Sequence, residues 1–266
     1  MDSRFCATCG FKLYERDQSP DAGRQVQPID LPDLEPPPTL ADLQNRFRDR
    51  FDERVTELGG KLKAYRKRAI ESDFLETVEN RFEQLIREVS KLEVPRRTRF
   101  LEQTFSDLLD YFLIEKCADL NPVQPPTAAL TYQDIPAQRD NLLRIIRGYL
   151  ELDKEKEQHF VDFLTMPQSK LQNASKAFLH ASPSETLLLL FDNSLTGSLR
   201  EGFGFTDRGL YWKQYFQPAR SVAFTELVRL QLEGRPLQIN GLFFDANRNV
   251  NLRMIYLLRK LRADFG

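Results

Sequence analysis

The chain has 266 residues, of which 41% are hydrophobic and 29% are charged, and its formal net charge is -1. This composition fits a globular chain that is long enough for two small domains, and it excludes a wholly disordered protein. The nearly neutral charge excludes a global attraction to nucleic acid or to an anionic membrane, so either kind of binding would require a local patch.

Two features concern the location of the protein. The first residues lack the apolar stretch of a signal peptide. The longest apolar run, residues 187–191, is far too short to span a bilayer. We therefore expect a cytoplasmic protein with no transmembrane segment.

A C-x-x-C motif lies close to the start of the sequence. Cys6 and Cys9 precede Gly10, which is the pattern of one knuckle of a zinc ribbon. Tetrahedral zinc needs about four ligands, and this pair supplies half of them. Either the fold brings in another Cys or His side chain, or a second polypeptide completes the site; the other such residues in the chain are Cys117, His159 and His180. Zinc is the expected cofactor, and a degenerate knuckle that has lost its metal is the alternative.

The sequence after residues 1–13, which hold the knuckle, changes character twice. Residues 14–38 are rich in proline and in acidic residues, which is typical of an extended linker. In residues 39–166 apolar side chains recur at steps of three and four, which predicts a helical bundle. The helices expected there cover about 40–69, with a weak point at Gly59-Gly60, then 74–92, 97–117 and 140–164. A connector helix is expected within residues 167–183.

The periodicity switches to that of strands from residue 184. Short apolar runs alternate with turn residues, and Asp207-Arg208-Gly209 predicts a hairpin between two of the strands. The strands expected cover about 186–191, 202–206, 210–213, 222–224, 228–232, 237–239 and 242–244. A final amphipathic helix is predicted to begin at Asn249.

The hairpin segment Thr206-Asp207-Arg208-Gly209-Leu210-Tyr211, together with its flanking strands, resembles the bacterial PH-like domains related to the GRAM group. The resemblance covers the chain after residue 167, and proteins of this kind often carry a knuckle similar to residues 5–10. It implies an α+β fold, in which the helical bundle is followed by a C-terminal PH-like β-barrel, residues 184–266, capped by one helix. It also implies a module that binds another protein or a second copy of itself. Between Asp192 and Gly202 the only cation is Arg200, so specific lipid binding is not expected.

Catalysis is not expected from this sequence. It contains no P-loop, no dinucleotide-type glycine pattern, no nucleophile elbow and no H-E-x-x-H motif. Carboxylate pairs such as Asp107 and Asp110 lie on charge-rich helices, and we interpret them as solvated faces. The function predicted is therefore a non-catalytic adaptor or assembly protein. The alternative is a nucleic-acid-binding accessory protein that uses the knuckle and the basic runs at residues 61–68 and 96–99.

The candidate partner-binding residues lie in and after the hairpin. They are Arg208, Trp212, Lys213, Tyr215 and Phe216. Aromatic rings beside cations are typical of protein interfaces. The alternative is that these rings fill the interior of the domain.

Overall fold

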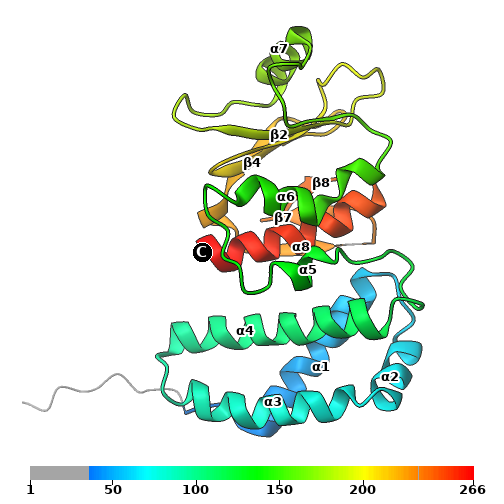
Figure 1. The fold of residues 1–266 in the computed structure, drawn as a ribbon, viewed down its shortest axis with the longest axis vertical. Coiled ribbons are helices and arrows are strands. Elements are labelled where there is room, and N and C mark those ends of the chain that lie inside the picture. Colours follow the sequence, from blue (N-terminus) through cyan, green and yellow to red (C-terminus); the bar gives the residue numbers. More distant parts are fainter. Residues whose placement is uncertain (1–35, 233) are drawn as a thin grey trace, which may run out of the picture. The chain divides into compact units, whose positions relative to one another are not determined.

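Four helices form the N-terminal half of the part that the computed structural model describes, which comprises residues 36–232 and 234–266 (Figure 1). They are α1 (Leu40–Glu57), α2 (Leu62–Glu71), α3 (Phe74–Val89) and α4 (Val94–Tyr111). Thr39 caps α1 as predicted, because its hydroxyl accepts the backbone N–H of Asp42 while the Asp42 carboxylate accepts the N–H of Thr39.

The helix predicted over residues 40–69 is divided into α1 and α2, and the break lies at Gly59-Gly60, where the sequence predicts a weak point. Gly59 has a φ of +72°, a conformation that favours glycine. A Cβ on Gly60 would lie 2.5 Å from the ring of Tyr65. The two glycines therefore end α1 and let the chain turn closely around the first residues of α2.

Aromatic rings fill the core of the bundle. Phe47 from α1 contacts Phe82 and Phe105 edge to face, with ring centroids 5.5 and 5.6 Å apart. Phe74 stacks on Phe112 at 4.3 Å. Such pairs contribute about 0.5–1.5 kcal/mol each beyond the burial of their area. The apolar periodicity of the sequence therefore corresponds to a real core.

The segment after α4 departs from the predicted fourth helix. A π-helical turn, η1 (Phe112–Lys116), follows α4, and then come α5 (Ala128–Thr131), α6 (Leu142–Leu150) and the short 3-10 turn η2 (Leu152–Lys154). Glu151, with a φ of 46°, ends α6 in the left-handed conformation. The helix predicted over residues 140–164 is therefore too long, and its last part contains the short strand β1 (His159–Phe160).

Eight short strands form two antiparallel sheets in the described residues. The first sheet has the order β1-β2-β3-β4-β5, and the second has the order β6-β7-β8. The bounds are β2 (Leu187–Asp192), β3 (Gly202–Thr206), β4 (Gly209–Lys213), β5 (Arg220–Ala223), β6 (Leu230–Leu232), β7 (Leu237–Ile239) and β8 (Leu242–Phe244). The predicted hairpin is present: Phe203 in β3 lies opposite Trp212 in β4. The connector helix, α7 (Gln168–Ala177), precedes β2.

The predicted PH-like β-barrel is wrong. The fold is α+β, but its strands form two separate sheets, and no closed barrel is present in the residues that the structure describes. The 3-10 turn η3 (Phe224–Glu226) interrupts the chain between β5 and β6, and each strand of the second sheet has only three residues. Strands this short offer few backbone groups for closing a barrel against the first sheet.

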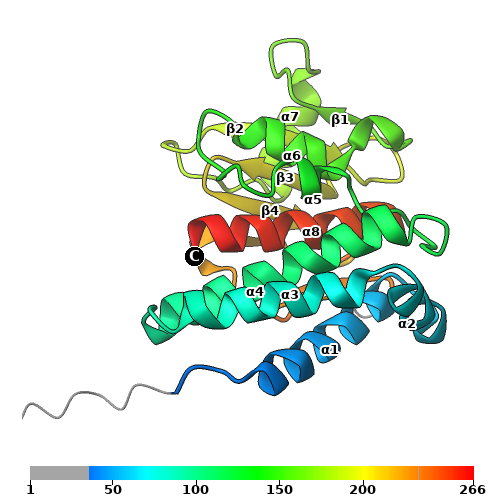
Figure 2. The same cartoon turned by 60° about the horizontal axis from the view of Figure 1, so that its bottom comes forward.

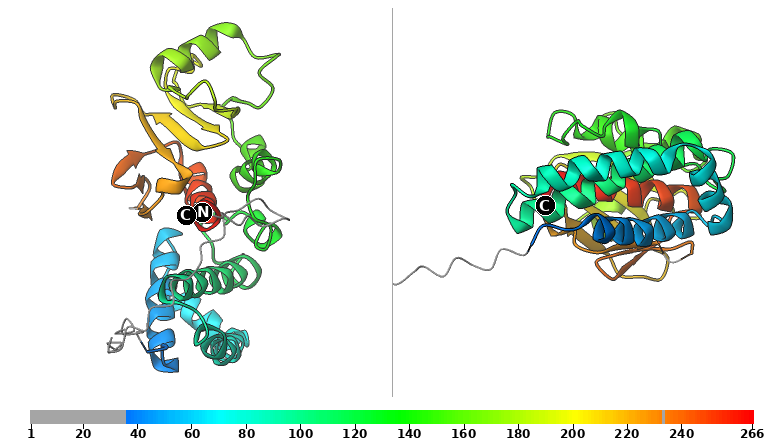
Figure 3. Two further views of the ribbon diagram at one scale, coloured as in Figure 1. Left: turned by 90° about the vertical axis from the view of Figure 1, so that its left-hand side faces the viewer. Right: turned by 90° about the horizontal axis from the view of Figure 1, so that it is seen from below.

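The last helix, α8 (Arg248–Phe265), lies between the sheets and the bundle (Figures 1 and 2). Figure 3 shows the same central position from two further sides. Its N-cap is Asn247, whose side chain accepts the N–H of Val250, so the predicted start at Asn249 is two residues late. Because neighbours surround it, α8 buries even polar residues such as Asn251 and Lys260. It is a central helix and not the cap of a barrel.

The domain boundaries stay predictions. Residues 36–266 belong to one compact unit, while residues 1–35 lie outside the described residues. The boundary predicted at residue 167 separates β1 from its partner β2, with which it pairs through Phe160 and Leu190. No helix in the described part of the chain is long and apolar enough to cross a membrane.

Candidate functional site

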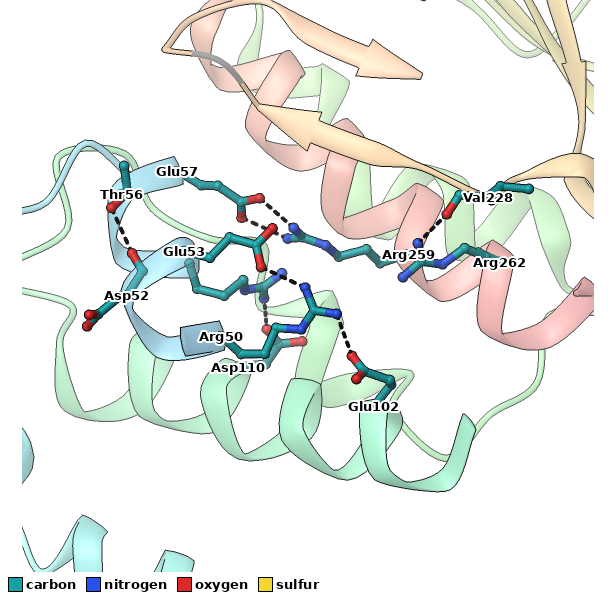
Figure 4. Close-up of polar contacts among 11 residues, drawn as sticks. Arg50, Asp52, Glu53, Thr56, Glu57, Glu102, Asp110, Val228, Arg259 and Arg262 are labelled. Carbon is teal, nitrogen blue, oxygen red and sulfur yellow. Dashed lines mark hydrogen bonds and ion pairs between the residues drawn. The ribbon is translucent and has the colours of Figure 1, made fainter. Parts of the chain in front are cut away.

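A layer of charged side chains joins α1 and α4 of the bundle to α8 (Figure 4). On α1 these residues recur at steps of three and four, so they share one face of the helix. We call them the charged layer: Arg50, Glu53, Arg54 and Glu57 from α1, Glu102 and Asp110 from α4, and Arg259 and Arg262 from α8. Within the described residues, the ion pair between Glu57 and Arg259 links the bundle to the central helix, beside an apolar core that the two share.

Two of these ion pairs hold the layer together. Arg259 of α8 binds Glu57 of α1 with both terminal nitrogens, Nη1 to Oε2 at 2.9 Å and Nη2 to Oε1 at 2.5 Å. Arg54 binds Asp110 of α4, and its guanidinium lies 4.1 Å from the ring centroid of Tyr256. Arg54 is 5% exposed and Asp110 is 9% exposed. Burial lowers the pKa of Arg54, but the charges of Asp110, Glu57 and Glu53 together outweigh burial and leave this pKa above its ordinary value. Arg54 is therefore a permanent cation inside the molecule.

Two further cations of the charged layer, Arg50 and Arg262, are close enough for their charges to interact. Arg50 donates to Glu53 at 2.8 Å, and its Nη2 lies 3.0 Å from Oε2 of Glu102. Arg262 donates to the backbone carbonyl oxygen of Val228 at 2.9 Å. Burial, together with the nearby charges of Arg259 and Arg50, lowers the pKa of Arg262. The charges of Glu102 and Glu53 partly offset this effect, and the guanidinium stays protonated.

The charged layer forms one wall of a cavity of about 520 Å³. Its remaining lining includes Arg99, Asp107, Tyr149, Leu227 and Leu230. The volume lies within the range of small-molecule sites, roughly 300–1,000 Å³. The walls combine an apolar part with polar side chains from several elements, as binding sites for small molecules do.

Asp107 is the carboxylate of this cavity with the most unusual environment. Burial raises its pKa from an ordinary 3.8 to about 6, and the neighbouring Asp110 and Asp134 add to the shift. The side-chain amide of Gln103 donates to Asp107 at 2.7 Å and opposes the shift. Asp107 forms no ion pair with any residue in the described part of the chain. The interpretation of Asp107 and Asp110 as parts of solvated faces is therefore wrong.

The residues predicted to bind a partner do not form one site. Trp212 is 0% exposed, and its indole N–H donates to the carbonyl oxygen of Phe243 at 2.9 Å. Arg208 is exposed at the turn before β4, and Lys213 is half-buried at the other end of that strand. Arg208 is therefore separated by the length of β4 from the residues that follow Lys213. The alternative prediction, that the rings fill the interior of the domain, is confirmed for Trp212.

Tyr215 and Phe216 are exposed together. They lie in residues 214–217, which we call the aromatic turn; the N–H of Gln217 donates to the carbonyl oxygen of Gln214 at 3.0 Å and closes it. Phe216 is 89% exposed and Tyr215 is 57% exposed, with ring centroids 4.2 Å apart. The side chain of Gln214 is buried and accepts a hydrogen bond from Asn193 at 3.3 Å, so the turn is fixed to the loop after β2.

The backbone of Phe216 is strained. Its φ is 58°, which is the left-handed region. A residue with a Cβ pays roughly 1–2 kcal/mol for this conformation, and glycine does not. Such outliers persist where the surrounding structure enforces them, and they often occur at functional positions. The chain therefore presents a large aromatic side chain to solvent at a conformational cost.

The expectation of a zinc-binding chain is not supported by the described residues. Cys6 and Cys9 lie outside them. Within residues 36–232 and 234–266, no group of three or more His, Cys, Asp and Glu side chains could hold a metal ion. Cys117 is buried and free, and burial raises the pKa of its thiol to about 12, which disfavours the thiolate that a metal requires.

The two basic runs are partly occupied by contacts within the molecule. Arg66 binds Asp52, Lys67 binds Glu71, and Arg68 binds Asp119. In the second run, Arg97 is buried and donates to the backbone carbonyl oxygens of Pro36 and Leu92. These pairs reduce the positive charge available for phosphates and weaken the nucleic-acid alternative.

No protein-family model matches the sequence, and no curated protein or solved structure matches the chain. The resemblance to the bacterial PH-like group therefore stays a prediction, and its barrel is wrong for the reason given above. The two features that carry a functional argument are the aromatic turn and the charged cavity.

Proposed function

We propose that this chain is a non-catalytic assembly protein, and that the aromatic turn binds another protein or a second copy of the chain. The observation that carries this proposal is the exposure of Phe216 in a strained conformation, with Tyr215 beside it. Exposed aromatic rings held in fixed positions are typical of the centres of protein interfaces. A ring in this position lacks a packing role, because 89% of its surface is exposed.

The surroundings of the turn support the same function. Leu195, in the loop that is bonded to the turn through Asn193, is 88% exposed. Lys213 precedes the turn, and Arg220 follows it in β5. An apolar centre with basic residues at its margin suits a partner surface that is apolar with an acidic rim.

Phe216→Gly separates binding from folding. Glycine removes the ring and accepts the left-handed backbone, so the folded state should lose no stability and should gain up to about 1 kcal/mol. Sedimentation velocity over a range of concentrations measures self-association, and capture of partners from the native host measures association with other proteins. We expect either form of association to be lost while the melting temperature is unchanged or raised.

The matched control is Ile70→Ser. Ile70 is 72% exposed on α2, away from the aromatic turn in the sequence and in the fold. This variant should associate as the parent does. Association that persists in Phe216→Gly, or that is lost equally in Ile70→Ser, would refute the proposal.

The nucleic-acid alternative and the knuckle at Cys6 and Cys9 stay predictions. Carboxylates pair with much of the basic run on α2, which leaves fewer free cations there for phosphates.

A further inference from the structure

The cations that line the cavity differ in whether a carboxylate neutralises them. The six are Arg50, Arg54, Arg99, Arg259, Lys260 and Arg262. Four of them form ion pairs: Arg50 with Glu53 and Glu102, Arg54 with Asp110, Arg259 with Glu57, and Lys260 with Asp264. Arg99 and Arg262 form none within the part of the chain that the structure describes.

The two remaining guanidiniums come from different helices. Arg262 extends from α8 and makes one hydrogen bond, to the carbonyl oxygen of Val228. Arg99 is exposed on α4 and has no hydrogen bond or ion pair to any described residue. A guanidinium carries five N–H donors and stays charged, so both groups retain donors for a ligand in the cavity.

Two buried donors in the same cavity lack acceptors. The hydroxyl of Tyr256 and Nε of Arg54 are buried and have no hydrogen-bond partner among the described residues. Both residues line the cavity. An unsatisfied buried polar group costs about 1–3 kcal/mol, so an acceptor that reached either atom would be stabilising.

We propose that this cavity binds a small molecule that bears a phosphate group, with Arg262 and Arg99 as the residues that hold the phosphate oxygens. The planar guanidinium matches the oxygens of phosphate in a two-point contact. The apolar part of the lining, Leu227 and Leu230 with the ring of Tyr149, can accommodate an organic group attached to the phosphate.

The cavity lining also holds carboxylates that oppose an anion: Glu53, Glu102, Asp107 and Asp110. Glu53 and Glu102 pair with Arg50 and also raise the pKa of Arg262 through their charges, and Asp110 pairs with Arg54. Asp107 forms no ion pair with any described residue and is the carboxylate that opposes an anion most directly. It lies two helical turns along α4 from Arg99, however, which is about 12 Å at 1.5 Å per residue. A ligand phosphate bound at Arg99 would therefore be well separated from this carboxylate, whereas an amine would be attracted to it.

Isothermal titration of the full chain with pyrophosphate and with adenosine triphosphate tests the proposal, at constant ionic strength. The first probe represents a free phosphate compound and the second a phosphate with an organic group. We expect binding of at least one probe, weakened about tenfold or more in Arg262→Gln and in Arg99→Gln, since a charge-assisted hydrogen bond contributes about 1.5–3 kcal/mol. Glutamine keeps a donor for the carbonyl oxygen of Val228, so the folded state should be preserved.

The matched control is Arg48→Gln. Arg48 is exposed on α1, outside the cavity lining, and this variant should bind as the parent does. Spermidine, titrated in the same way, serves as a cationic probe. The proposal would be overturned if neither phosphate compound bound, if all variants bound equally, or if spermidine bound in place of the phosphate compounds. Melting curves of every variant show whether a loss of binding comes from unfolding.

Discussion

Replacing Asp110 by alanine tests whether the charged layer stabilises the fold. The change removes the carboxylate that neutralises Arg54, which is 5% exposed, and leaves a guanidinium inside the molecule. Removing one partner of a buried ion pair costs about 3–5 kcal/mol. We expect the lower end, about 3 kcal/mol, because Arg54 keeps its contact with the ring of Tyr256 at 4.1 Å.

The assay is urea unfolding at pH 7, with the melting temperature as a second measure. For a domain of this size a loss of 1 kcal/mol lowers the melting temperature by about 2–4 °C, so the expected decrease is about 6–12 °C. The double variant Arg54→Met, Asp110→Leu removes both charges and keeps the volume. It should unfold within about 1 kcal/mol of the parent, because apolar residues replace buried ion pairs at little cost.

Asp49→Ala is the control for this experiment. Asp49 is an exposed carboxylate on α1, the helix that carries Arg54. Its loss should change the free energy of unfolding by less than about 0.5 kcal/mol. If Asp110→Ala lost less than about 1 kcal/mol, or if the double variant were as unstable as the single one, the argument from an uncompensated buried charge would be wrong.

Two further predictions concern the cavity and the first sheet. The pKa of Asp107 is raised from 3.8 to about 6, so the folded chain holds a proton that the unfolded chain has lost, and stability should fall as the pH rises through this range. Asp107→Asn should abolish that fall and raise the free energy of unfolding at pH 7 by on the order of 2 kcal/mol in urea titrations at pH 4.5, 5.5 and 7. Gly202→Ala should cost about 3 kcal/mol or more in the same assay, because its Cβ would lie 2.0 Å from the carbonyl oxygen of Phe191. Gly241→Ala, also at a positive φ but with no atom within 4 Å of the new Cβ, should cost only about 1–2 kcal/mol; similar losses in the two glycine variants would contradict the steric argument.

The elements of this fold were largely predictable from local patterns, whereas their assembly was not. The apolar period of α3 and the turn between β3 and β4 depend on neighbouring residues, and both are present where the sequence places them. The prediction of a barrel is wrong because closure of a barrel depends on pairing between strands that are far apart in the chain. The turn η3 lies where the chain passes from the first sheet to the second.

Trp212 shows a second limit of sequence reasoning. The hairpin does alternate its faces, but the sequence does not show that one face carries all of its large apolar side chains: Trp212 and Leu210 lie opposite Phe203 and Phe205, and all four are 0% exposed. The indole therefore points into the core and bonds to Phe243, a residue that follows it at a distance in the chain. The exposure of Phe216 was predictable only as one of two alternatives, because its left-handed backbone is a property of the folded turn.

The charged layer was harder to predict from the sequence than the helices and the hairpin. On α1 the buried stripe contains Phe47, Phe51 and Val55, and Arg50 and Arg54 each immediately precede a member of that stripe. A charged side chain at the border of an apolar stripe becomes partly buried when the stripe packs into the core. It then requires a partner of opposite charge. The partner of Arg54 comes from α4, and that of Glu57 comes from α8, 202 residues further along the chain. Charges of both signs beside a stripe therefore indicate that another charged helix packs there, although the sequence of one helix does not identify which.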